Sequence, residues 1–86
     1  MSSAPSSQIL QVIIRLKDRI LWQGEATSFS STNQIGPFDI LPEHARFVGL
    51  IEQYITVHTL TKEEKWPIAK GILSVKDSVV EAYLDY

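Results

Sequence analysis

The chain has 86 residues, 44% of them hydrophobic, and its eight Lys and Arg against ten Asp and Glu give a formal net charge of −2. A chain of this length closes around one hydrophobic core, which leaves no room for a second domain. The charge balance, without any basic cluster, disfavours nucleic-acid binding, and no apolar run approaches the roughly 18 residues that span a bilayer. We therefore expect a soluble protein without direct membrane insertion. Because cysteine is absent, disulfides and thiolate metal sites are excluded.

The first seven residues differ in composition from the rest of the chain. They read Met-Ser-Ser-Ala-Pro-Ser-Ser and lack the basic and apolar regions of a secretory signal. We predict a flexible N-terminal tail over residues 1–7 and one domain over residues 8–86.

The domain begins with a strand signature. Apolar residues recur at every second position and so share one face of a strand: Leu10, Val12, Ile14 and Leu16. A polar turn at Lys17–Arg19 leads to a second apolar segment at Ile20–Gln23. A hairpin is predicted.

The next segment, residues 25–32, is rich in Ser and Thr, and only Ala26 and Phe29 are candidates for the core. Residues 33–37 contain Gly and Pro, which favour a turn. A short strand follows at residues 38–41 and is ended by Pro42. Side chains alternate along a strand, so Phe38 and Ile40 should share one face while Leu41 takes the other.

The second half of the chain continues the pattern. A polar break at Glu52–Gln53 separates two predicted strands, the charged residues 62–65 suggest a hairpin tip, and residues 76–78 suggest a turn. The predicted strands are residues 46–51, 54–58, 66–69, 72–75 and 79–84. No helical period is sustained, so the sequence predicts an all-β fold, an antiparallel two-sheet sandwich of about 8–10 short strands. The aromatic residues in these strands are expected in the core: Trp22, Phe47, Tyr54, Trp66 and Tyr83.

The sequence offers little catalytic chemistry. His44 stands beside Glu43, but no Cys is present and no Ser lies in a nucleophile-elbow motif. His58 and His44 are the only imidazoles and have no metal-ligand spacing, while the carboxylates and glycines are dispersed. We expect no catalytic residue, no metal and no cofactor, and the chain is not predicted to be an enzyme.

One stretch carries a specific resemblance. Residues 36–45 read Gly-Pro-Phe-Asp-Ile-Leu-Pro-Glu-His-Ala and resemble the G-x-F-G-I-L-P-x-H-A hallmark of the epsilon subunit of F-type ATP synthases. Residues 21–25 resemble the L-F-x-G-E of the same family, and residues 71–75 with Val79–Val80 resemble its C-terminal strand motif. The resemblance covers about residues 10–84 and implies the N-terminal β-sandwich of epsilon, with two five-stranded sheets.

Three features depart from that family pattern. Asp39 and Lys70 each stand where the family usually has Gly, and Glu52–Gln53 replaces another family Gly. The sequence given ends at Tyr86, where many members continue into an inhibitory helical hairpin. A natural short form and an excised domain are both open, and the inhibitory role is not carried over.

The resemblance implies a mechanical function. The epsilon subunit is a non-catalytic rotor component that binds the gamma subunit with one face and rests on the c-ring, coupling proton transport to ATP synthesis. It would lie peripherally on the cytoplasmic face of the plasma membrane in a bacterium. By resemblance, the residues that bind gamma or the c-ring are Asn33, Gln34, Gly36, Pro37, Phe38, Glu43 and His44. The alternative is a stand-alone epsilon-like protein-binding module with no rotor role.

Overall fold

Seven strands make up most of the structure, a computed structural model that describes residues 9–42 and 46–85. They are β1 (Leu10–Arg15), β2 (Ile20–Ala26), β3 (Ser28–Thr32), β4 (Pro37–Ile40), β5 (Phe47–His58), β6 (Glu63–Lys76) and β7 (Val79–Asp85). Within these two stretches no helix is long and apolar enough to cross a membrane. The all-β prediction is confirmed. The predicted tail at residues 1–7 lies outside the described residues.

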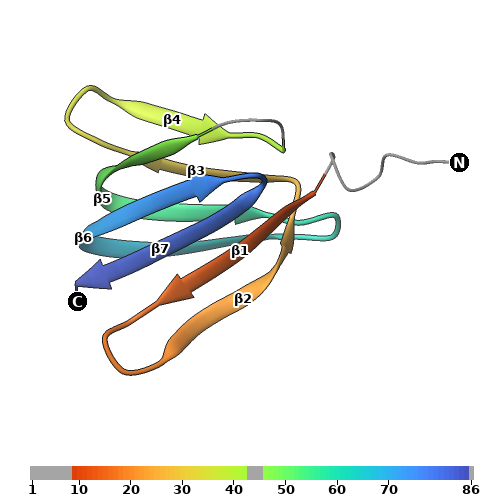
Figure 1. Cartoon of the computed structure of the whole chain (residues 1–86), viewed down its shortest axis with the longest axis horizontal. Coiled ribbons are helices and arrows are strands. Elements are labelled where there is room, and N and C mark those ends of the chain that lie inside the picture. Colours follow the sequence, from red (N-terminus) through yellow and green to blue (C-terminus); the bar gives the residue numbers. More distant parts are fainter. Residues whose placement is uncertain (1–8, 43–45, 86) are drawn as a thin grey trace, which may run out of the picture.

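The strands form one hydrogen-bonded sheet that is folded into two layers (Figure 1). The strand order is β2-β1-β7-β6-β5-β3-β4. The two longest strands, β5 and β6, contribute to both layers. The first half of β5 pairs only with the second half of β6. The second half of β5 pairs with the first half of β6 on one side and with β3 on the other. We call the layer containing β2, β1 and β7 the first layer and the layer containing β3 and β4 the second layer.

Both long strands change register at the place where they pass between layers. Glu52 is opposite Lys70 and Gln53 is opposite Ile68, so Ala69 is an extra residue on β6. Gln53 has a φ of 76°, in the left-handed region that non-glycine residues seldom adopt. Such a bulge bends a strand without ending it. Against β3, Ser31 is opposite Ile55 and Thr32 is opposite Glu52, so β5 bulges on that side at residues 53–54. The polar break predicted at residues 52–53 therefore lies within one continuous strand.

This continuity explains why seven strands are found rather than 8–10. Residues 46–51 and 54–58 belong to one strand, and so do residues 66–69 and 72–75. The predicted hairpin tip at residues 62–65 is also displaced, since β6 already begins at Glu63. The turn is closed instead by Thr59, whose backbone amide donates to the Lys62 carbonyl at 2.8 Å.

The pairing is mixed rather than wholly antiparallel. The β1–β2 hairpin and the β6–β7 hairpin, with its turn at Asp77–Ser78, are present as predicted. However, β1 and β7 run parallel, with Val12 opposite Val80. The parallel pair places the N-terminal hairpin beside the C-terminal strand and so completes the first layer.

The core lies between the two layers and is entirely hydrophobic apart from a few hydroxyl groups. Its most buried members include Leu10, Val12 and Ile14 from β1, Phe29 from β3, Ile55 and Val57 from β5, and Val80, Ala82 and Leu84 from β7. The predicted inward faces of residues 10–14 and the predicted core positions Ala26 and Phe29 are confirmed.

The expectation that every strand aromatic is in the core is wrong for Tyr54 and Tyr83. Trp22, Phe47 and Trp66 pack against the core, but Tyr54 is half-buried outside it and 45% of Tyr83 is exposed. Its neighbours Ala82 and Leu84 occupy the inner face of β7, so alternation directs Tyr83 outward.

Candidate partner-binding surfaces

The turn between β3 and β4 is organised by its own first residue. The Asn33 side-chain Oδ1 accepts hydrogen bonds from the backbone amides of Ile35, at 2.8 Å, and Gly36, at 3.2 Å. The backbone N–H of Asn33 in turn donates a hydrogen bond to the Gly36 carbonyl oxygen at 3.2 Å. Gly36 has a φ of 148°, which L side chains rarely adopt. The turn holds Ile35 at its tip, where 97% of the residue is exposed.

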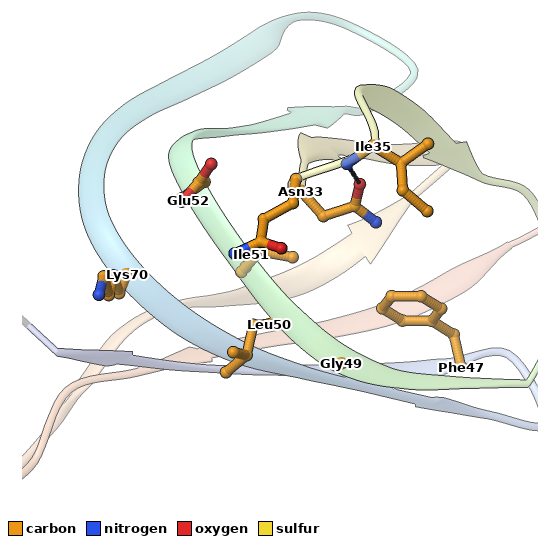
Figure 2. Close-up of a pocket in the computed structure, with 9 residues that line it drawn as sticks. Asn33, Ile35, Phe47, Gly49, Leu50, Ile51, Glu52 and Lys70 are labelled. Carbon is orange, nitrogen blue, oxygen red and sulfur yellow. Dashed lines mark hydrogen bonds between the residues drawn. The ribbon is translucent and has the colours of Figure 1, made fainter.

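A groove of about 400 Å³ opens below this turn (Figure 2). Phe47, Gly49 and Ile51 alternate along the inward face of β5 on one side of it, and Asn33 and Ile35 lie on the other side. Gln34, Leu50, Glu52 and Lys70 complete the lining. Glu52 and Lys70 are cross-strand partners at the bulge and place opposite charges at one end of the groove.

The described part of the hallmark segment, residues 36–42, divides between core and surface as predicted. Ile40 is buried, and Phe38 is half-buried on the same face, with its ring centroid 5.3 Å from that of Phe47. Leu41 points outward and is 55% exposed, and Pro37 is exposed at the start of β4. Phe38 therefore packs against the core.

The predicted binding residues that the structure describes lie in the β3–β4 turn and at the start of β4. Asn33 and Gln34 line the groove, and Gly36 and Pro37 follow them in the turn and the start of β4. Glu43 and His44 lie outside the described residues, so the structure places only the first part of the predicted set.

The outer face of the first layer carries a row of apolar side chains that the sequence analysis missed. Leu50, Ile72 and Tyr83 are consecutive cross-strand partners on β5, β6 and β7, and they are 68%, 49% and 45% exposed. Val48, two residues before Leu50 on the same face, is 77% exposed. We call these four residues the outer row. Adjacent exposed apolar side chains of this kind mark interaction surfaces more often than scattered ones do.

A sequence signal for this row exists in residues 47–51, Phe-Val-Gly-Leu-Ile. The segment is apolar at both odd and even positions, whereas a strand with one solvated face normally alternates. Such a strand is either buried on both sides or exposes apolar groups, and only the arrangement of neighbouring strands decides which.

Charged side chains form only isolated surface pairs in the described parts of the chain. The Lys62 Nζ lies 2.8 Å from a carboxylate oxygen of Glu64, and this hydrogen bond with its charge attraction raises the pKa of Lys62. His58 lies with its Nδ1 3.9 Å from a Glu63 carboxylate oxygen. Over residues 9–42 and 46–85, no three His, Asp or Glu side chains gather in a way that could hold a metal ion.

The comparison with protein families settles the family. Residues 9–85 match the model described as ATP synthase, Delta/Epsilon chain, beta-sandwich domain, which is nearly the whole chain. The chain belongs to this family. The resemblance seen in the hallmark segment is thereby confirmed. No curated protein matches the chain in sequence.

Two solved structures share the fold of this delta/epsilon-type domain. One is the mitochondrial ATP synthase of Euglena gracilis, OSCP/F1/c-ring in rotational state 1, with a TM-score of 0.83 and 17% identity over 96% of this chain and 53% of that chain. The other is the central stalk/c-ring of the Tetrahymena thermophila mitochondrial ATP synthase, with a TM-score of 0.72 and 7% identity over 90% of this chain and 63% of that chain. The chain thus spans between about half and two thirds of the chains that it resembles.

Proposed function

We propose that this domain is a non-catalytic rotor component of an ATP synthase, which binds the gamma subunit and the c-ring and helps couple proton transport to ATP synthesis. Membership of the delta/epsilon family supports the assignment to this complex. The observation that carries the binding role is the outer row, an apolar surface too continuous to be incidental on a sandwich whose core is already complete. The protein would then lie at the surface of the membrane that holds the c-ring.

The gamma subunit is the partner proposed for the outer row. Torque can pass between two proteins only if they do not slip, and buried apolar contacts with a polar rim hold two rigid bodies in one register. The row crosses three adjacent strands of the first layer, which ladder hydrogen bonds hold together. Arg15, opposite Tyr83, and Glu81, two residues from Tyr83, supply charged groups at its border.

The c-ring is the partner proposed for the β3–β4 turn. The turn is fixed by the Asn33 side chain, so it presents Gln34 and Ile35 in a defined shape. An exposed side chain on a rigid turn loses little conformational entropy when it binds. Glu43 and His44 are proposed to join this contact or the gamma contact by the family resemblance alone.

The outer-row proposal is tested by binding to the purified gamma subunit. Ile72→Glu places a charge in the middle of the row and should weaken gamma binding at least roughly tenfold, the size expected for a central contact. The matched control is Leu60→Glu at the β5–β6 hairpin tip, where an apolar residue is 87% exposed but lies off the row. The control should bind within about twofold of the unmodified chain.

A chain that binds gamma equally well with Ile72→Glu would contradict the use of the outer row. A chain that does not bind gamma at all would favour the alternative, an independent protein-binding module. The turn is tested separately: Ile35→Ser should weaken binding to c-rings in nanodiscs.

A further inference from the structure

The two layers have four free strand edges among the described residues, and one of them is unlike the others. In the first layer the edges are β2 and the first half of β5, and in the second layer they are β4 and the first half of β6. Natural sheets discourage strand addition at such edges by placing charges or proline there. Three edges follow this rule: β2 carries Glu25, β4 carries Pro37 and Asp39, and β6 carries Glu63, Lys65 and Pro67.

The first half of β5 has no such protection. Residues 47–51 contain neither a charge nor a proline. Val48 and Leu50 are exposed on its outer side, while Phe47, Gly49 and Ile51 face the groove on its inner side. A side chain at Gly49 would meet the Phe47 ring at 2.9 Å, so the ring lies over the glycine and closes the gap that it leaves. The edge is therefore smooth and apolar on both sides.

The backbone N–H and C=O groups on one side of residues 47–51 also have no partner strand among the described residues. Residues 47–51 pair with β6 on one side, and β3 joins β5 only from Glu52 onward. In an antiparallel pair every second residue directs its N–H and C=O away from its partner. No described strand occupies that side of residues 47–51, which border the groove beside the β3–β4 turn (Figure 2).

We propose that this edge binds an extended segment of the gamma subunit by strand addition, an inference that rests on the proposed function. The backbone N–H and C=O groups of this edge form hydrogen bonds with an extended chain, and the groove of about 400 Å³ receives the side chains on one face of that chain. Val48 contacts its other face, and Leu50, which is exposed on the outer side, also borders the groove. Because both sides of the edge are apolar, the added segment is uncharged and apolar at successive positions. The edge adjoins the outer row through Val48 and Leu50, so both belong to one continuous interface.

Hydrogen exchange of the full chain, with and without purified gamma subunit, tests the proposal. Gamma should slow exchange of alternate amides in residues 47–51 by about tenfold or more, because these amides gain hydrogen-bond partners. If gamma contacted only the outer face, residues 47–51 would gain no backbone hydrogen bonds and their amide exchange would not slow in this alternating pattern. The variant Gly49→Lys adds an inward-pointing charge of the kind that protects natural edges, and it should reduce gamma binding at least roughly tenfold. Gln23→Lys on β2, the other edge of the first layer, is the matched control and should bind as the unmodified chain does.

The outcomes separate this inference from the proposed function. Gamma binding that is lost with Ile72→Glu but leaves residues 47–51 unprotected overturns strand addition and keeps the rotor function. If the chain does not bind gamma, both the rotor function and strand addition are contradicted. Protection of residues 47–51 that rises with the concentration of the chain alone overturns the assignment to gamma, because the occupant is then a second copy. If Gly49→Lys loses its far-UV circular dichroism signal, the exchange experiment on the unmodified chain decides.

Discussion

The rings of Phe38 and Phe47 pack against each other across the two layers, with centroids 5.3 Å apart and planes inclined by 39°. Phe38 comes from β4 in the second layer and Phe47 from β5 in the first. Their contact holds the two strands together at the side of the sandwich where the groove opens, and the Phe47 ring also covers Gly49.

Truncation of this contact should destabilise the domain. Phe47→Ala removes a half-buried ring and uncovers Gly49, so we expect the free energy of unfolding to fall by about 2–3 kcal/mol, less than for a fully buried Phe. Val48→Ala, on the exposed face of the same strand, should change it by no more than about 0.5 kcal/mol. Urea denaturation of the two variants measures the difference, and equal losses would contradict the role given to the aromatic pair.

Within the hallmark segment, adjacent residues should behave differently. Ile40 is 6% exposed and lies opposite Phe29 in the β3–β4 ladder, so Ile40→Ala should cost about 2–4 kcal/mol through lost burial and a cavity. Leu41→Ala, at a residue 55% exposed, should cost less than about 1 kcal/mol. Chemical denaturation checks both values. If Leu41→Ala lowered the free energy of unfolding while Ile40→Ala left it unchanged, the assignment of the two faces would be reversed.

The bulge at Gln53 gives a substitution that should stabilise. A non-glycine residue in the left-handed region costs about 1–2 kcal/mol, and glycine avoids that cost while losing about 0.5–1 kcal/mol of backbone entropy. We therefore expect Gln53→Gly to raise the free energy of unfolding by up to about 1 kcal/mol. The matched control is Gln23→Gly in β2, where φ is not positive and the same exchange should lower stability. A lower melting temperature for Gln53→Gly than for the unmodified chain would show that the Gln53 side chain contributes more than the strain costs.

The sequence by itself determined the features that depend on neighbouring residues. Period-two alternation placed Leu10, Val12 and Ile14 in the core, and the chemistry of Asn, Gly and Pro located the turn at residues 33–37. The hallmark at residues 36–45 identified the family. The core positions follow from side-chain alternation and the turn from local backbone preference, and neither requires knowledge of distant strands.

The tertiary structure decided what depends on pairing between distant segments. Only the sheet shows that β1 and β7 are parallel and that β5 continues through the bulge at Gln53, because ladder hydrogen bonds join residues far apart in sequence. The same holds for Leu50 and Ile72: an apolar strand residue is buried or exposed according to which layer covers it, and none of residues 9–42 and 46–85 forms a layer over this face. The outer row and the free β5 edge are therefore properties of the folded sandwich, although every residue in them is visible in the sequence.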